Sequence, residues 1–183
     1  MAEVKPPLPA LLFCGALTAF ADAFDRARRR LSETFGPIQA ESETWPFTHT
    51  DYYAGQMGAP LRRLFLAFER PVAQDFLAEA KIVTNALEAE LAREGRFPVR
   101  RPLNLDPGLI LPSRLILASC KDHAHRVYLG RGIYAEVTLL WRGGEWQPLP
   151  WTYPDFREAR CHAFFADLRR RHLERLRGRS RSG

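Results

Sequence analysis

Two amphipathic helical patterns, each preceded by a short apolar run, constrain the fold of this chain most strongly. Residues 22–35 and 74–93 repeat apolar side chains at three- and four-residue spacing, which is typical of a helix that buries one face. Short apolar or alternating runs predict strands around these two helices, at residues 8–16, 38–45, 61–68 and 99–105. The predicted order is therefore β-α-β-β-α-β, which is the order of a ferredoxin-like unit.

The C-terminal third continues the pattern with antiparallel strands. Residues 125–129 and 133–141 flank Gly130-Arg131-Gly132 and predict a hairpin, and residues 145–147 predict a third short strand. Residues 155–177 predict a last helix, whereas residues 113–120 fit either a short helix or a strand. We therefore expect an α+β fold in which the ferredoxin-like order is extended by an antiparallel β-meander and a terminal helix. The meander would extend the first sheet or form a second small layer.

Turn-forming residues occur at two places between these elements. Asp106-Pro107-Gly108 predicts a turn directly after the strand at 99–105, because proline fixes φ and glycine accepts a positive φ. Residues 46–60 are rich in Gly, Pro, Thr and Tyr and predict a long loop. Loops of this length in compact domains are often functional.

Length and composition predict one domain in a reducing compartment. The chain has 183 residues, 46% of them hydrophobic, and its three cysteines are too few and too scattered for a disulfide framework. We expect a single domain over residues 1–177, a disordered basic tail over 178–183, and a cytoplasmic location. The apolar run at 10–21 is preceded by three prolines and little positive charge, so it predicts a strand and a helix start and not a signal peptide. No apolar run is long enough for a membrane span.

The net charge of +6 does not predict a broad nucleic-acid surface. Seven arginines and one glutamate lie between Arg169 and Gly183, so this segment accounts for the whole net charge. The remainder of the chain is neutral, whereas a nucleic-acid-binding domain places a basic stripe on its folded surface. Nucleic acid is therefore expected only as a partner of the basic C-terminal tail.

Sequence signatures of common mechanisms are absent. The chain has no P-loop, no dinucleotide-binding glycine motif, and neither a zinc-protease nor a nucleophile-elbow motif. His123 and His125 would share a face of an extended segment and could bind a metal, but no second pair of ligands is visible. We expect no metal site, and the sequence names neither a cofactor nor a reaction.

Polar residues at the ends of the predicted strands are the candidate site. Glu136 lies in the middle of a strand, where a carboxylate is disfavoured, and the hairpin would place Arg126 or Tyr128 beside it. His125, Glu136 and Asp106 are the candidate proton-transfer groups. The candidate ligand-binding residues are cationic, aromatic or amide side chains, with the first two at the rim: Arg63, Tyr53, Asn104, Lys121 and Arg126. Asn104 and Asp106 would point to the same side of an extended segment.

Several short segments together resemble a known family. They are Thr50-Asp51-Tyr52-Tyr53 with Met57-Gly58, Lys81 with Thr84-Asn85, Asn104-Leu105-Asp106-Pro107-Gly108, Lys121-Asp122 with 125–129, 132–139 and Trp151-Thr152-Tyr153-Pro154-Asp155. From about Leu8 to the last helix, the chain is similar to the bacterial family catalogued as domain of unknown function 4416. The resemblance implies a bacterial protein that is a stand-alone domain, and it implies no activity.

Three hypotheses follow from these residues. The first is a pocket that binds a small anionic or nucleotide-type ligand, with or without catalysis. The second is a module that binds RNA or a ribonucleoprotein through a sheet face and the basic tail. The third is a structural or assembly protein with no pocket and with a large apolar surface patch. None of the three involves a membrane, and the sequence does not fix the oligomeric state.

Overall fold

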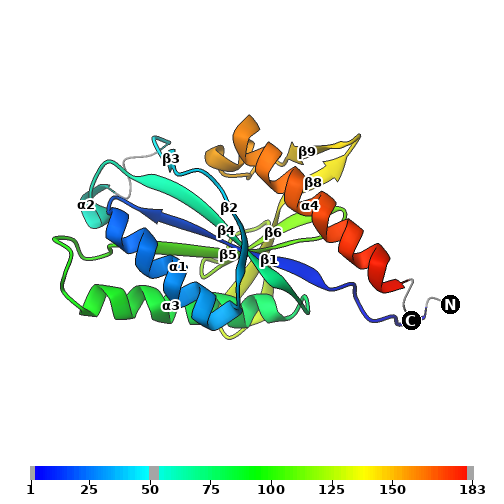
Figure 1. Cartoon of the computed structure of the whole chain (residues 1–183), viewed down its shortest axis with the longest axis horizontal. Helices are drawn as coiled ribbons and strands as arrows, with labels where there is room; N and C mark the ends of the chain where they lie inside the picture. The colour runs from blue at the N-terminus through cyan, green and yellow to red at the C-terminus, as the bar shows by residue number, and fades with distance from the viewer. Residues whose placement is uncertain (1–2, 50–53, 181–183) are drawn as a thin grey trace.

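The protein is an α+β fold built on one nine-stranded antiparallel sheet (Figure 1). The computed structural model describes residues 3–49 and 54–180. The strands are β1 Ala10–Thr18, β2 Ile38–Glu41, β3 Trp45–Pro46, β4 Arg62–Val72, β5 Asn104–Ile110, β6 Arg114–Ser119, β7 Val127–Gly130, β8 Ile133–Arg142 and β9 Glu145–Pro148. The helices are α1 Ala21–Phe35, α2 Ala54–Met57, α3 Phe76–Arg93, the 3₁₀ turn η1 Pro154–Arg157 and α4 Ala159–Ser180.

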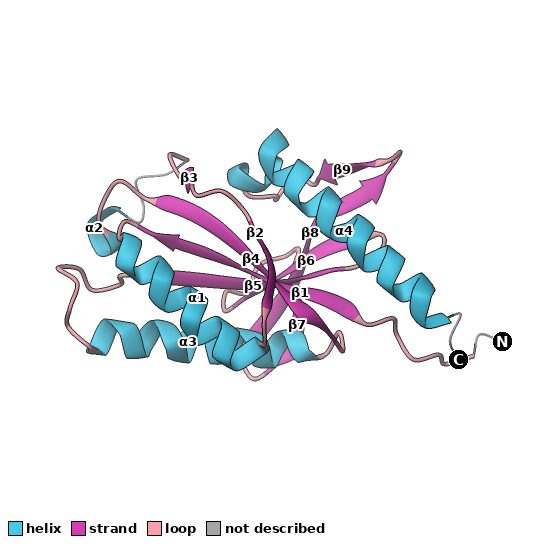
Figure 2. Ribbon diagram, viewed as in Figure 1, coloured by secondary structure: helices cyan, strands magenta, loops and turns pink. Residues whose placement is uncertain are grey.

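The strands follow the order β2-β4-β1-β5-β6-β8-β7, with β3 beside β4 and β9 beside β8. Helices α1 and α3 cover one face, and α4 lies across the other (Figure 2). Residues 113–120, for which the sequence left two alternatives, form strand β6. The meander therefore extends the first sheet and does not form a separate layer.

Strand β1 is buried along its whole length because both of its faces are covered. Leu12, Cys14 and Ala16 point to the core under α1 and α3. Leu11 and Phe13 point to a second core under α4, where Phe13 packs against Phe165 with the ring centroids 4.8 Å apart. A continuous apolar run is thus what a strand in this position requires.

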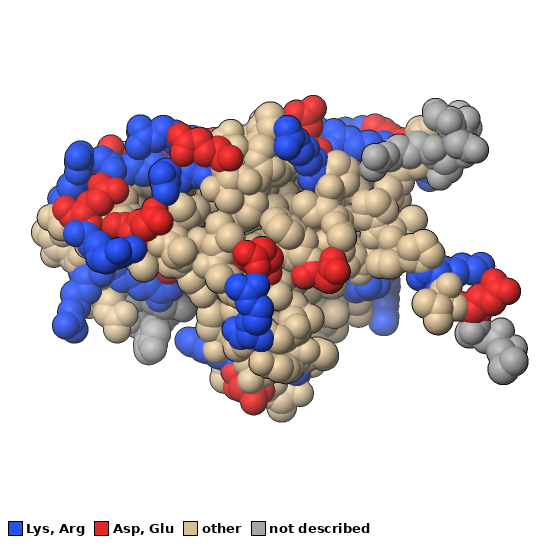
Figure 3. Space-filling model, turned by 90° about the horizontal axis from the view of Figure 1, so that it is seen from below, with Lys and Arg blue, Asp and Glu red and all other residues tan. Residues whose placement is uncertain are grey.

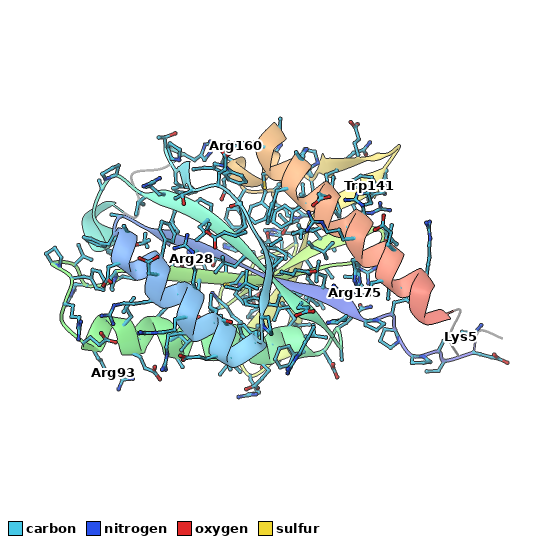
Figure 4. All side chains as sticks on the ribbon, in the orientation of Figure 1. Lys5, Arg28, Arg93, Trp141, Arg160 and Arg175 are labelled. Carbon is cyan, nitrogen blue, oxygen red and sulfur yellow. The ribbon has the colours of Figure 1, made fainter. Side chains whose placement is uncertain are left out.

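Helix α4 is held on the sheet by stacking of arginines as well as by its apolar face. Arg160 lies over the Trp45 ring and Arg169 lies over the Trp141 ring, with 5.1 Å and 4.0 Å to the centroids. Figure 4 labels one residue of each pair, Arg160 and Trp141. Arg175 also donates a hydrogen bond to the Glu69 carbonyl. The helix continues to Ser180, so residues 178–180, which we expected to be part of a disordered tail, are helical, and residues 181–183 lie outside the described residues.

The turn expected after the strand at 99–105 was wrong. Asp106-Pro107-Gly108 is not a turn: it lies inside β5, paired with Phe13, Cys14 and Gly15 of β1. The glycine serves close packing, because a Cβ at Gly108 would lie 2.4 Å from the Phe13 ring and 2.6 Å from the Ile116 carbonyl oxygen.

Regular alternation along β8 would place its odd-numbered residues on one face, but the strand is irregular. The register shifts between the pairs Leu115–Leu139 and Ile116–Val137, so Thr138 is extra. As a result Ile133 packs under α1 and α3, whereas Leu139 packs under α4. A bulge of this kind bends a strand and redirects its side chains, and Glu136 lies directly before it.

Candidate functional site

The candidate site lies where the sheet splits between β5 and β6. The two strands pair only from Gly108–Ile110 to Leu115–Leu117. Before Gly108, β5 continues along β1, and after Leu117, β6 continues along β8. The two strands therefore diverge, and we call the resulting opening the fork.

A pocket of about 520 Å³ fills the fork. This volume is within the range of small-molecule sites, roughly 300–1,000 Å³. Its charged lining residues come from six segments that are far apart in the sequence: Arg63, Lys81, Arg101, Asp106, Lys121, Glu136 and Asp155. His49, Asn85, Asn104 and Tyr153 also line it.

Arg63 is at the centre of the pocket floor and is almost fully buried. Its Nε donates to Asp155 Oδ2 at 3.0 Å and its Nη1 donates to Asp106 Oδ2 at 3.2 Å. Burial by itself would lower the pKa of Arg63, but the two carboxylates outweigh this and raise it. Gly15 leaves room for the guanidinium, since a Cβ there would lie 3.2 Å from Nη1.

Asp106 joins the floor to the α3 side of the pocket. Its Oδ1 lies 3.5 Å from Lys81 Nζ, and its Oδ2 accepts a hydrogen bond from Asn104 at 2.6 Å. The expected common side of Asn104 and Asp106 is thereby confirmed. Burial opposes ionisation of Asp106, but Lys81 and Arg63 hold its pKa below the ordinary value. Asp106 is therefore an ionised carboxylate with fixed orientation.

The wall on the α3 side carries three cations, and we call it the cationic wall. Lys81 is buried and donates to the Leu105 carbonyl at 2.7 Å. Arg101 donates to Glu88 at 3.1 Å and also to Asn104. Lys121 follows β6, whose end is held to α3 by a contact between Asn85 and Cys120 at 3.2 Å. Lys81, Arg101 and Lys121 thus place three cationic side chains on this wall.

The opposite wall is formed by β8 and the segment that leads into η1, and we call it the carboxylate wall. Glu136 is 2% exposed and accepts from Arg126 Nε at 2.8 Å, so the cross-strand partner expected for it is confirmed. His125 also contacts Glu136 Oε2, at 3.2 Å. Arg126 further donates to Tyr153 Oη at 2.8 Å. His125 and Arg126 do not line the pocket but hold Glu136 and Tyr153, which do.

The predicted residues thus divide into three groups. Arg63, Asn104, Asp106, Lys121 and Glu136 line one pocket, although Arg63 lies on its floor and not at its rim. His125 and Arg126 lie behind the carboxylate wall. Tyr53 lies outside the described residues.

Sequence reasoning missed several residues of the pocket as site residues, among them His49, Lys81, Tyr153 and Asp155. Lys81 carried a usable signal, because it lies on the same helical face as Leu77, Ala80 and Thr84, and a lysine on a buried face is rare without a partner. His49 contacts Glu158 at 2.7 Å, but nothing local in the sequence relates the two. Asp155 looked like an ordinary helix cap.

A metal site has no geometric basis in the parts of the chain that the structure describes. No three His, Cys, Asp or Glu side chains among them are placed to hold an ion. The rings of His123 and His125 stack with centroids 5.8 Å apart, and His125 stacks on Trp151. The aromatic stacking supports the position of His125 behind Glu136.

The fold and the site define an α+β protein with a charged pocket at a split in an antiparallel sheet. The chain belongs to the family described as Domain of unknown function (DUF4416), whose model matches residues 8–172. This span includes every charged residue that lines the pocket. Searches of curated proteins and of solved structures gave no match. No described helix is both long enough and apolar enough to cross a membrane.

Proposed function

We propose that the protein binds a small anionic or nucleotide-type ligand in the pocket at the fork. One observation carries the proposal: buried or half-buried charged groups from five separate segments converge on one cavity of about 520 Å³, which the exposed Lys121 also lines. Burial of charges is costly, and a packed apolar core would be more stable. A binding function explains why the fold retains these charges.

The preference for an anion follows from the N–H donors of the cationic wall. Arg63 and Lys81 are balanced by Asp106 and Asp155, and Glu136 is balanced by Arg126. Arg101 is paired with Glu88. Ammonium and guanidinium groups have about three and five N–H donors, so the two lysines and the arginine of the cationic wall can donate to a ligand as well as to their partners. A phosphate or carboxylate would accept these charge-assisted hydrogen bonds.

A thermal-shift experiment tests the proposal. The purified protein would be heated with phosphate, pyrophosphate, AMP, ADP, sugar phosphates and dicarboxylates in turn. A ligand present at one hundred times its Kd stabilises a protein by about 2.7 kcal/mol, which is a clear shift of Tm. We expect at least one anion to raise the Tm of the wild type and to do so less for Lys121→Glu.

The matched control is Arg142→Glu, which makes the same charge change at an exposed residue that does not line the pocket. It should respond as the wild type does. No shift with any anion, or an equal loss in both variants, would contradict the proposal.

An RNA-binding role is favoured less, because four of the seven arginines between Arg169 and Gly183 already make contacts within the chain. Arg170 and Arg171 pair with Asp167, and Arg169 and Arg175 bond to backbone carbonyls. Basic and acidic side chains are also interspersed on the face that Figure 3 shows. A surface of mixed sign gives little of the electrostatic affinity on which nucleic-acid binding depends.

We further propose that the first part of the chain is a ferredoxin-like unit. The order β5-β1-β4-β2 supports this, since each neighbouring pair is antiparallel. So does the packing of α1 and α3 in the same core. A comparison of backbone coordinates with ferredoxin-like domains tests it, and superposition over all four strands and both helices is the expected result.

A further inference from the structure

We propose that the pocket takes a phosphorylated sugar, with the phosphate on the cationic wall and the sugar hydroxyls on the carboxylate wall. The class includes free sugar phosphates and the ribose phosphate part of nucleotides. The inference rests on the proposed function and adds the ligand's chemistry and its direction in the pocket. It follows from the difference between the two walls.

The cationic wall is suited to a phosphate. Lys81 and Arg101 are held in place by carbonyl and carboxylate partners, so little side-chain entropy is lost when a ligand binds. The same wall also carries Lys121 and the side-chain amides of Asn85 and Asn104. Ammonium, guanidinium and amide groups are the donors that bind phosphate oxygens.

The carboxylate wall is suited to hydroxyl groups and not to an anion. Within residues 3–49 and 54–180, Glu136 accepts from Arg126 and His125 at Oε2 and from Thr138 at Oε1. A carboxylate has about four acceptor positions, so Oε1 can accept one more hydrogen bond. A sugar hydroxyl donates to a carboxylate in a charge-assisted bond, whereas a phosphate there would be repelled.

Tyr153 supplies a donor beside this acceptor. Its Oη accepts from Arg126 Nη2 at 2.8 Å, which turns the phenolic proton away from Arg126. Burial and the nearby Glu136 raise the pKa of Tyr153 above its ordinary value, so the phenol keeps its proton at neutral pH. Glu136 and Tyr153 therefore present one acceptor and one donor side by side, which matches the two roles that each sugar hydroxyl can fill.

The two walls face each other across Asp106 and Arg63. One cavity therefore has a wall that is suited to an anion and a wall that is suited to hydroxyl groups. Asp106 lies between Lys81 and Arg63 and is held ionised by both. A ligand with an anionic group at each end would place one of these groups beside the carboxylates of Glu136 and Asp155. A ligand with one phosphate and several hydroxyls satisfies both walls.

Isothermal titration with four compounds tests the proposal: ribose 5-phosphate, glucose 6-phosphate, inorganic phosphate and ribose. We expect at least one sugar phosphate to bind at least tenfold more tightly than phosphate, and ribose to bind more weakly than either. Lys121→Ala should weaken sugar phosphate and phosphate by the same factor. Tyr153→Phe should weaken the sugar phosphate about three- to tenfold, the effect of one hydrogen bond, and leave phosphate unchanged.

The Tyr153→Phe variant keeps the ring of a residue that is 41% exposed, so we expect it to fold, and the unchanged phosphate affinity would confirm an intact pocket. Binding of phosphate with no gain from either sugar would overturn this inference and leave the proposed function in place. Equal loss of phosphate and sugar phosphate in Tyr153→Phe would also overturn it. Failure of every anion to bind would overturn the proposed function itself.

Discussion

The two ends of the β5–β6 pair differ in strand pairing, polarity and packing, although they are parts of the same strands. From Gly108 to Ile110 the strands are hydrogen-bonded, apolar and closely packed against Phe13 and Leu115. From Asn104 to Asp106 they are separated by a pocket that is lined with charge. We call these parts the closed end and the open end.

The comparison shows that the pocket results from an interruption of strand pairing and not from a loop placed over the sheet. Pro107 has no N–H to donate, and it stands directly between the last paired residue of β5 and Asp106. Backbone groups released from the ladder then lie beside polar side chains, such as the Leu105 carbonyl that accepts from Lys81. The same interruption thus creates both the space and the need for polar groups.

The largest expected effect is at the open end, for Arg63→Met. The substitution keeps much of the volume but leaves Asp106 and Asp155 buried without their shared cation. Removal of one partner of a buried ion pair costs about 3–5 kcal/mol. Urea unfolding should show this loss, and the exposed Arg142→Met should change the free energy of unfolding by less than about 0.5 kcal/mol. A loss below about 1 kcal/mol in Arg63→Met would mean that the charges are well solvated.

At the closed end, Gly108→Ala should cost about 1–3 kcal/mol through overpacking. The added Cβ would meet the Phe13 ring and the Ile116 carbonyl at distances that no real Cβ tolerates, so β6 must move. Gly178→Ala in α4 is the matched control, because its Cβ would meet no atom within 4 Å. An unchanged midpoint of urea unfolding in Gly108→Ala would show that the closed end is not tightly packed.

The sequence predicted β1, α3 and several residues of the open end, but it did not predict the course of β5. The apolar run of β1 and the helical face of α3 are local signals that predicted a strand and a helix, whereas the apolar run of β6 fitted either a strand or a short helix. The pocket depends on where β5 leaves β6, and Asp106-Pro107-Gly108 is more common in turns than in strands. Residues such as His49 and Asp155 reach the pocket only through tertiary packing.

A smaller effect on the free energy of unfolding is expected from acid, and it should arise at the open end. Because the folded pKa of Asp106 is held below 3.8, its ionised form stabilises the fold above that pH. This stabilisation is lost as the pH falls from about 4 through the lowered pKa. The free energy of unfolding should therefore fall less steeply with acid in Asp106→Asn than in the wild type, as urea titrations at several pH values would show. The exposed Asp75→Asn should keep the wild-type slope.

The smallest expected effect is that of Pro107→Ala. The alanine restores an N–H and increases the conformational freedom of the unfolded chain, which should lower stability by about 0.4–1 kcal/mol. Asn104 to Asp106 should remain separate from β6, because Lys81, Arg63 and Asn104 still hold Asp106. New protection of amides at Ser119 to Lys121 from hydrogen exchange would instead show that proline alone keeps the fork open.

The most direct test of the central claim is an NMR titration of the ¹⁵N-labelled protein with ribose 5-phosphate, in which amide shifts at the two ends of the β5–β6 pair are compared. We predict that saturating shifts appear at the open end, in Asn104 to Asp106 and Ser119 to Lys121. The closed end, Gly108 to Ile110 and Leu115 to Leu117, should change little. Shifts confined to the C-terminal part of α4, or no shifts at all, would contradict a ligand site at the fork.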